Sequence, residues 1–335
     1  MAGTAKEAMF ARNLEGGRVE CQLCPHGCML REGLAGRCGV RVVEGGELRT
    51  ANYAMVTSAS IDPIEKKPLY HFMPGSGILS VGTFGCNMGC DFCQNWEISQ
   101  ARSGGQRLEP KELAALAERY RSRSVGVAYT YSEPSVWYEY VFDSAQLIKE
   151  LGLKSVLVTN GFINPEPLAA LLPYVDAMNI DLKAMDDGFY QRVCKARLRP
   201  VLDAISQAVE AGCHVELTTL VVPGLNDSTE EMRRLAQWVA ELSRSIPLHI
   251  SRYFPNYRMD QAPTPIGILV SCAETAREHL DYVYIGNAAL PEWRDTTCHA
   301  CGAVLIERQG YAPPVVHLEG QRCPKCGAQA AVVLG

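Results

Sequence analysis

Between residues 74 and 290, short apolar segments alternate with amphipathic ones. The apolar segments are rich in β-branched and aromatic residues and are mostly apolar on both faces, which is typical of strands in a covered parallel sheet. The pattern predicts six strands, at 78–85, 124–131, 155–160, 177–183, 214–223 and 248–255, and favours a seventh at 282–287.

The amphipathic segments between these strands predict helices. In 111–120, apolar residues recur three and four positions apart, so they share one helical face. A second helix is predicted over 198–211, because Gly212 is a residue type common just after a helix end. A third is predicted to begin after Ser228, since Ser228 and Glu231 have the spacing of a capping box.

Repeated strand–helix alternation indicates either a (βα) barrel or a doubly wound sheet. We expect an α/β fold whose core, residues 74–290, is a partial (βα)6 TIM-like barrel, with its reactive groups at the C-terminal ends of the strands. Glycine-rich turns between short apolar runs predict a cysteine-rich β segment over 1–73. A repeated Cys-x2-Cys-Gly unit predicts a zinc ribbon over 291–335.

Composition and charge narrow the possible partners. The 335 residues are 47% hydrophobic and 21% charged, and the formal net charge of -5 argues against a nucleic-acid or acidic-membrane surface. No apolar run approaches the roughly 18–20 residues that span a bilayer, and the first residues lack the apolar region of a secretory signal. We therefore predict a cytoplasmic protein without a membrane partner. In that reducing compartment, clustered cysteines are expected to bind metal.

One loop carries three of the cysteines, spaced Cys86-x3-Cys90-x2-Cys93, directly after the first predicted strand. Three thiolates can hold three irons of a [4Fe–4S] cluster and leave the fourth iron open to the amine and carboxylate of S-adenosylmethionine. Gly85 would let the loop fold tightly, as would Gly89. The alternatives are a zinc site with a distant fourth ligand, or a buried cysteine loop.

Two further clusters contain four cysteines each. In the tail, two Cys-x2-Cys-Gly units separated by 21 residues predict a structural zinc site, with a second iron–sulfur cluster as the alternative. The N-terminal cluster predicts a closed site for zinc or for an iron–sulfur cluster, and zinc is the favoured metal. The tail ligands are Cys298, Cys301, Cys323 and Cys326, and the N-terminal ligands are Cys21, Cys24, Cys28 and Cys38.

The three-cysteine loop resembles that of the radical S-adenosylmethionine (radical SAM) superfamily. The stretches "EKKPLYHFMPGS", "GTFGCNMGCDFCQNWEISQ", "AYTYSEP", "VTNGF", "NIDLK", "VVPGLND" and "CGAVLIERQGY" extend the resemblance over nearly the whole chain. They are similar to one branch, the AmmeMemoRadiSam system radical enzymes, which resemble pyruvate formate-lyase activating enzymes. The resemblance implies reductive cleavage of S-adenosylmethionine to a 5′-deoxyadenosyl radical, which abstracts hydrogen from a substrate.

The resemblance also implies where the cofactor binds. Glu133 stands where these enzymes hold the methionyl amine, although Tyr131 and Ser132 replace two glycines there. The following strand ends would surround the carboxylate and ribose, with Lys183 suited to the carboxylate and Asp181 to a hydroxyl or a monovalent cation. Val158 stands where a further carboxylate is expected, which puts a cation in doubt. Phe92, between the last two cysteines of the loop, is placed to pack beside a bound adenine, and the cofactor-binding residues that the resemblance implies are Glu133, Thr159, Asn160, Asp181 and Lys183.

Several of these residues have simpler interpretations. Asp181 and Lys183 point to the same face of a strand and could only pair with each other. Cys194 is a candidate hydrogen-atom relay or metal ligand, or else a buried small side chain. His249 and Arg252 either face the barrel mouth or are satisfied inside the barrel.

The substrate stays open at this level. It is unassigned, with a protein as one candidate; the alternatives are the glycine of a glycyl-radical enzyme, or a molecule linked to Memo-like and AMMECR1-like companions. A flavodoxin or ferredoxin is implied as the reductant. Two alternatives of other classes are an iron–sulfur electron carrier, which would need a fourth cysteine near 83–96, and a zinc-ribbon binding module.

Overall fold

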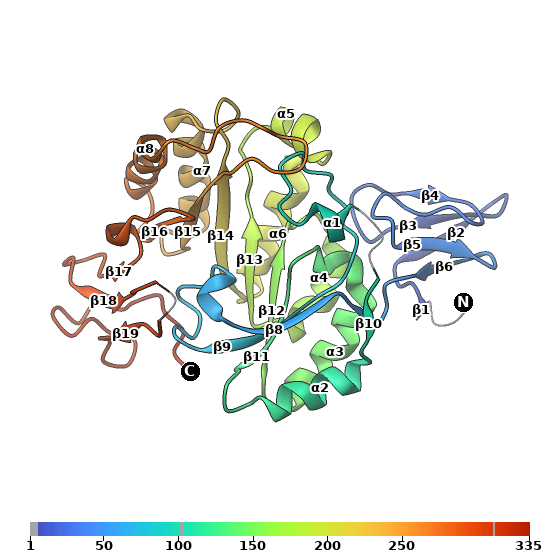
Figure 1. Ribbon diagram of the computed structural model, residues 1–335, viewed down its shortest axis with the longest axis horizontal. Helices are drawn as coiled ribbons and strands as arrows, with labels where there is room; N and C mark the ends of the chain where they lie inside the picture. The colour runs from blue at the N-terminus through green and yellow to red at the C-terminus, as the bar shows by residue number, and fades with distance from the viewer. Residues whose placement is uncertain (1–5, 101–103, 311) are drawn as a thin grey trace.

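The computed structural model describes residues 6–100, 104–310 and 312–335 and is built around one curved sheet of eight strands (Figure 1). Seven strands run parallel, and β8 is antiparallel to β9 at one edge. In spatial order the strands are β16 (Val283–Gly286), β15 (Leu248–Arg252), β14 (His214–Val221), β13 (Ala177–Asp181), β12 (Lys154–Thr159), β11 (Gly126–Tyr129), β9 (Gly77–Gly82) and β8 (Ser58–Pro63).

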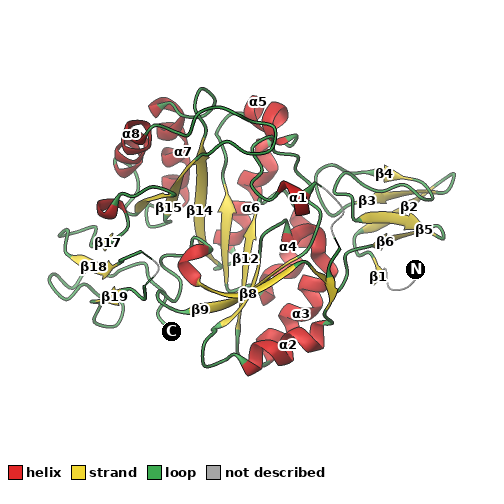
Figure 2. Ribbon diagram, viewed as in Figure 1, coloured by secondary structure: helices red, strands yellow, loops and turns green. Residues whose placement is uncertain are grey.

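Helices alternate with the parallel strands along the chain and pack against the sheet, as Figure 2 shows. The expected partial barrel is confirmed, and the seventh predicted strand is present as β16, at the edge opposite β8. Among the described residues, no helix is long and apolar enough to cross a membrane. The helices are α1 (Trp96–Ser99), α2 (Pro110–Arg119), α3 (Tyr138–Glu150), α4 (Pro165–Leu171), α5 (Asp187–Phe189), α6 (Leu198–Glu210), α7 (Thr229–Leu242) and α8 (Ile266–Arg277).

Local sequence explains where the predicted helices end and begin. Gly212 follows α6 with φ +75, a left-handed conformation that glycine adopts without strain. The Ser228 hydroxyl accepts a hydrogen bond from the Glu231 N–H at 3.1 Å, as a helix cap should. The Glu231 carboxylate does not complete the capping box; it accepts instead from the N–H of Met185.

Strand β8 has no clear sequence signal, because its residues, "SASIDP", are short and largely polar. It pairs with β9 from Ser58 opposite Gly82 to Pro63 opposite Gly77. The pairing satisfies backbone groups along an edge of the main sheet that would otherwise be unpaired. Long-range pairing, and not local periodicity, determines this strand.

Two smaller modules flank the barrel. The N-terminal one contains two three-stranded sheets, β1 (Lys6–Glu7) with β6 (Glu47–Thr50) and β5 (Arg41–Glu44), and β2 (Ala11–Leu14) with β3 (Arg18–Cys21) and β4 (Met29–Leu30). A short pair, β7 (Met55–Val56) and β10 (Gln106–Arg107), lies beside the barrel. The C-terminal module contains β17 (Thr296–Thr297), β18 (Val304–Glu307) and β19 (Val315–Val316). The two modules lie on opposite sides of the barrel (Figure 1).

A buried carboxylate, that of Glu216, joins β14 and β15 to the segment that precedes β9. Glu216, on β14, is fully buried and accepts hydrogen bonds from the backbone N–H groups of Tyr70 at 3.0 Å and His71 at 2.7 Å. Its other neighbours are the Nε2 atoms of His214 at 3.1 Å and His249 at 2.6 Å. His249 is thus satisfied inside the barrel and does not face its mouth. Burial would raise the pKa of Glu216, but the hydrogen bonds from the two histidines hold that pKa well below its usual value.

His71 joins this network to the C-terminal module. Its ring lies between the Ala331 carbonyl oxygen, 2.7 Å from Nδ1, and the Tyr284 hydroxyl, 2.6 Å from Nε2. Since a carbonyl only accepts, Nδ1 carries the proton and Nε2 accepts from Tyr284. The His71 carbonyl also accepts from the N–H of Val333 at 2.8 Å. Burial lowers the pKa of His71 to about 4.

This burial predicts an acid-dependent loss of stability. The unfolded chain binds a proton at His71 below about pH 6.5, whereas the folded chain binds it only near pH 4. The free energy of unfolding should therefore fall by roughly 3 kcal/mol between those pH values through this residue alone. Urea unfolding of wild type and His71→Gln at several pH values measures the difference in slope. His317→Gln, at an exposed histidine, is the control; equal slopes in wild type and His71→Gln would contradict the assignment.

Candidate active site

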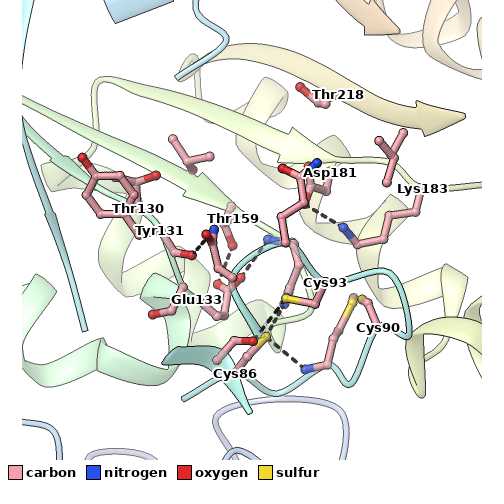
Figure 3. Close-up of a pocket in the computed structure, with 18 of the residues that line it drawn as sticks. Cys86, Cys90, Cys93, Thr130, Tyr131, Glu133, Thr159, Asp181, Lys183 and Thr218 are labelled. Atoms are coloured by element: carbon pink, nitrogen blue, oxygen red, sulfur yellow. Dashed lines mark hydrogen bonds and ion pairs between the residues drawn. The ribbon is translucent and has the colours of Figure 1, made fainter. Parts of the chain in front are cut away.

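A cavity of about 370 Å³ lies at the C-terminal ends of the parallel strands. Figure 3 shows the cysteines of the 86–93 loop on one side and the ends of the strands on the other. The cavity is open enough to leave the Asp181 side chain 37% exposed, while that of Lys183 is 10% exposed. All nine residues predicted for the cluster and the cofactor line it: Cys86, Phe92, Cys90, Cys93, Glu133, Thr159, Asn160, Asp181 and Lys183.

The cysteine loop follows β9 and contains two glycines, Gly85 and Gly89, that play different structural roles. Gly85 has φ +95, and a Cβ there would lie 2.5 Å from Val40 Cγ1 and 2.9 Å from the Cys38 carbonyl oxygen. The expected tight turn is therefore present, and it is pressed against the N-terminal module. Gly89 has no such backbone requirement; its N–H donates to the Cys194 carbonyl at 3.0 Å, and a Cβ would meet the side chain of Lys195 at 3.3 Å.

Sulfur spacing separates the three cysteine clusters. A tetrahedral zinc ion with Zn–S bonds of about 2.3 Å holds its sulfurs about 3.8 Å apart. Across the described residues, one group of cysteines has all its sulfurs within 4.8 Å of one another: Cys298, Cys301, Cys323 and Cys326. Two pairs in that group, Cys298 with Cys326 and Cys301 with Cys323, are 3.6 and 3.7 Å apart, which fits zinc.

The sulfurs of Cys86, Cys90 and Cys93 are not grouped this tightly, as suits ligands to different irons of one cluster. Donors also surround them. Asn160 Nδ2 lies 3.5 Å and the Met88 N–H nitrogen 3.4 Å from Cys86 Sγ, and Ser99 Oγ lies 3.2 Å from Cys93 Sγ. Such contacts orient and tune metal-bound thiolates.

Burial disfavours the deprotonated form of two thiols in this loop, so a positive charge such as a metal ion is needed to stabilise them as thiolates. Burial raises the pKa of Cys86 well above its usual value and raises that of Cys93 as well. A hydrogen bond from the Cys194 thiol lowers the pKa of Cys90. The donor set, its spacing and its surroundings therefore fit a [4Fe–4S] cluster.

Glu133 joins the ends of two strands. One carboxylate oxygen accepts from the Ser135 N–H at 2.9 Å and the Thr159 hydroxyl at 2.6 Å, and the other from the Asn160 N–H at 2.8 Å. Burial nevertheless raises the pKa of Glu133. Through Asn160, this carboxylate also positions a donor to Cys86.

The two residues before Glu133 are unusual. Tyr131 has φ +69, a conformation rare for a bulky residue, at the place where a glycine was expected. Its hydroxyl donates to Asp62 at 2.7 Å, and its carbonyl accepts from Asn95 at 2.7 Å, so both ends are held. The Ser132 hydroxyl oxygen is buried without a hydrogen-bond partner among the described residues, although Ser132 lines the cavity. A bound ligand could satisfy it.

Asp181 and Lys183 both pair with each other and line the cavity. Lys183 Nζ lies 2.7 Å from Asp181 Oδ2 and 5.7 Å from the centre of the Phe92 ring. Burial would lower the pKa of Lys183, but Asp181 and the nearby thiols of Cys90 and Cys194 raise it well above its usual value. The ammonium therefore stays charged and offers a cationic group to an anionic ligand.

Cys194 and Arg252 are not among the residues that line this cavity. Cys194 is buried at the end of a π-helical turn, Tyr190–Cys194, and its thiol contacts that of Cys90. The Arg252 guanidinium donates through Nε to the Thr264 carbonyl at 2.8 Å.

Sequence reasoning missed several lining residues. Ser251, one residue before the end of β15, could have been found by extending the strand-end rule, whereas Thr218 lies within β14 and is placed by its pairing opposite Asp181. Lys67, buried and 2.8 Å from Asp62, and Asn287, with φ +57, carry no local signal. Their positions depend on contacts between distant segments.

Comparison with known proteins agrees with this geometry. The family model for the Radical SAM superfamily matches residues 80–236. An uncharacterized protein of Methanocaldococcus jannaschii is 43% identical over 337 residues, which cover 98% of this chain and 100% of that protein. The pyruvate formate-lyase-activating enzyme of Clostridium pasteurianum is 28% identical over 176 residues, 50% of this chain and 72% of the enzyme.

Similarity of fold extends to a solved structure. Streptococcus suis SuiB bound to S-adenosylmethionine superposes with a TM-score of 0.51 at 16% identity. The match covers 65% of this chain and 50% of SuiB, so the chain spans about half the length of that protein. At this identity, the comparison bears on the fold.

The zinc assignment in the C-terminal module predicts a selective metal loss. Cys301→Ala removes one of four ligands, so zinc in the purified protein should fall by about one ion per chain while iron is unchanged. Elemental analysis of wild type and variant measures both metals. Cys213→Ala, at a cysteine outside the three clusters, is the matched control. Iron lost together with the zinc would contradict a separate zinc site.

Proposed function

The chain belongs to the radical SAM superfamily, and from that premise we propose that the cavity binds a [4Fe–4S] cluster on Cys86, Cys90 and Cys93 and S-adenosylmethionine on the strand ends beside it. The protein is a radical SAM enzyme. The bound cluster and cofactor supply reductive cleavage of the sulfonium, which yields methionine and a 5′-deoxyadenosyl radical that takes hydrogen from a substrate. The observation that carries the proposal is the convergence of three cysteine thiols and the buried cation of Lys183 in one cavity.

The chain's own residues bind and orient the cofactor. Lys183 offers its charged ammonium to the methionyl carboxylate, and the Asp181 carboxylate beside it accepts from a ribose hydroxyl. Glu133 has three of its acceptor positions occupied, so it holds the ends of β11 and β12 in register and leaves one further lone pair of Oε2 for the methionyl amine. The unpartnered Ser132 hydroxyl is a second polar group for that amine. The Phe92 ring offers an apolar surface for the adenine.

The substrate approaches from the open side of the cavity. Thr218, Leu220, Ser251 and Asn287 line the part formed by the later strands and supply mostly uncharged polar groups. We propose a substrate that is unassigned in identity, with a protein as one candidate. A glycyl-radical activase is the second candidate function, and the likeness to a pyruvate formate-lyase-activating enzyme favours it.

The proposal also covers the electron donor, the companion proteins and the cellular compartment. Reductive cleavage needs one electron, and a flavodoxin or ferredoxin would supply it. Memo-like and AMMECR1-like companions, and the AmmeMemoRadiSam branch itself, stay predictions. None of the fourteen cysteines, all of them among the described residues, forms a disulfide, which suits a reducing compartment such as the cytoplasm.

Anaerobic turnover tests the function. Reconstituted and reduced wild type should release 5′-deoxyadenosine from S-adenosylmethionine, and Cys86→Ala should release at least about 100-fold less because one cluster ligand is missing. Chromatography of the quenched reaction measures the product, and Cys272→Ala is the control. If reduced wild type with a full iron content releases no 5′-deoxyadenosine, the proposal fails. Deuterium transferred from a labelled glycine peptide into the product would favour the activase.

The role of Lys183 predicts a defect in binding. Lys183→Met should weaken binding of S-adenosylmethionine by about 10-fold or more, because a charge-assisted hydrogen bond to the carboxylate is lost. Anaerobic equilibrium binding to the reconstituted protein measures the affinity. Lys154→Met is the matched control, since Lys154 pairs with Asp176 at 3.0 Å and does not line the cavity. Equal affinities in the two variants would remove Lys183 from the binding site.

A further inference from the structure

We propose that Cys21, Cys24, Cys28 and Cys38 bind a second iron–sulfur cluster, and that this cluster passes electrons to the one held by Cys86, Cys90 and Cys93. The first part stands on the N-terminal module alone. The second part, the electron transfer, rests on the proposed function of the active-site cavity.

The four N-terminal sulfurs gather at one place and are supplied with donors. The Cys21 N–H donates to the Cys28 carbonyl at 2.9 Å, the Cys24 thiol has Cys21, Cys28 and Cys38 as neighbours, and the His26 backbone N–H faces its sulfur. The Arg37 N–H lies 3.5 Å from Cys28 Sγ, and Nη1 of Arg41 lies 3.8 Å from Cys21 Sγ. The N–H groups of Val40 and Arg41 face Cys38. Donors of this kind surround metal-bound thiolates.

The spacing of these sulfurs favours a cluster over a zinc ion. No three of them lie within 4.8 Å of one another, whereas all four sulfurs of the C-terminal module do. The N-terminal module also has one Cys-x2-Cys unit, Cys21 to Cys24, where a zinc ribbon has two. Neighbouring sulfurs that are spaced more widely than around a single ion suit the separate irons of a cluster, as they do in the 86–93 loop.

A buried positive charge accompanies the four thiols. Arg41 is fully buried, and its guanidinium reaches Cys21, the Met9 carbonyl at 2.8 Å and the carboxylate of Glu139, which is also fully buried. Its Nε atom is without a hydrogen-bond partner among the described residues. Glu139 balances the charge of Arg41, and the Arg41 nitrogen that faces Cys21 adds a donor to the sulfurs of the N-terminal site.

The N-terminal site is docked directly on the active-site loop. Nε2 of His26, two residues after Cys24, lies 2.7 Å from the carbonyl oxygen of Asn87, the residue after Cys86. The Pro25 carbonyl accepts from Arg197 at 2.6 Å, and the Leu23 carbonyl accepts from the Asn164 N–H at 3.0 Å. The chain between Cys24 and His26 therefore connects the two sites through a single hydrogen bond.

A second contact lies on the Cys38 side. The absence of a side chain at Gly85 lets the Cys86 loop approach the Cys38 carbonyl, and a cavity of about 80 Å³ is lined by both Cys38 and Cys86. Figure 1 shows the N-terminal strands on the side of the barrel where α1 and the active-site loop lie. The C-terminal zinc site lies on the opposite side of the barrel, so its position suits a structural role and not electron transfer.

The electron balance of the transfer is simple. The reduced N-terminal cluster loses one electron, and the active-site cluster gains it. That electron enters the sulfonium of S-adenosylmethionine as the carbon–sulfur bond breaks, which yields methionine and the 5′-deoxyadenosyl radical. An external one-electron donor of the flavodoxin or ferredoxin class then reduces the N-terminal cluster again.

The first experiment counts metal in full-length protein after anaerobic reconstitution. Wild type should hold about eight irons per chain, and the triple variant Cys86→Ala/Cys90→Ala/Cys93→Ala about four, with the Mössbauer spectrum of a [4Fe–4S] cluster and about one zinc. Cys213→Ser/Cys272→Ser is the control and should match wild type. A triple variant without iron overturns the second cluster, whether or not a second zinc is present. Eight irons without 5′-deoxyadenosine would instead refute the proposed function and leave the second cluster standing.

The second experiment compares two reductants in Cys24→Ser/Cys28→Ser. Formation of 5′-deoxyadenosine driven by reduced flavodoxin should fall about 10-fold or more, whereas formation driven by dithionite, a small reductant that can enter the open cavity, should stay within about 2-fold of wild type. Iron in this variant should fall by about four per chain while zinc is unchanged. Flavodoxin-driven turnover at the wild-type rate with four irons lost would overturn the proposed electron route.

Discussion

Burial of cysteine sulfur constrains this molecule more than any other requirement. A thiolate taken out of water needs a cation, and the cysteine clusters of this chain meet that need in two arrangements. Four closely spaced sulfurs in the C-terminal module suit one ion. Three sulfurs spread around an open cavity leave room for a ligand that is not protein. The same chemical constraint thus separates an architectural site from a reactive one.

The sheet places everything else around those sulfurs. Parallel strands in register bring Asp181 opposite Thr218 and place Thr159 at the end of the neighbouring strand β12, so polar groups from distant segments line one cavity. Glu133 then joins β11 to β12 and, through Asn160, reaches the sulfur of Cys86. The pairing of the strands therefore positions the polar residues at the cavity, and the buried Glu133 carboxylate orients Thr159 and Asn160 among them.

Sequence reasoning succeeded where the signal was local. Apolar β-branched runs located the parallel strands, and cysteine spacing together with strand ends located the residues that line the cavity. It did not find β8, whose polar residues join the sheet only because β9 offers them an edge. Nor did it place Lys67, or His249 in the Glu216 network, because those positions depend on partners many residues away. The left-handed Tyr131 was also out of reach, since its neighbours and not its residue type maintain that conformation.

The contact between His71 and the C-terminal module has a consequence for biosynthesis. The two hydrogen-bonded groups, the His71 ring and the Ala331 carbonyl, are 260 residues apart in the chain. A ribosome must therefore translate past the zinc-ribbon cysteines before His71 can contact Ala331, although the strands of the barrel emerge much earlier. During that interval Nδ1 of His71 lacks its acceptor at Ala331 and the His71 carbonyl lacks its donor at Val333, whereas Tyr284 is already available to Nε2. Metal loading of the C-terminal module would then complete the hydrogen bonds of the segment that precedes β9.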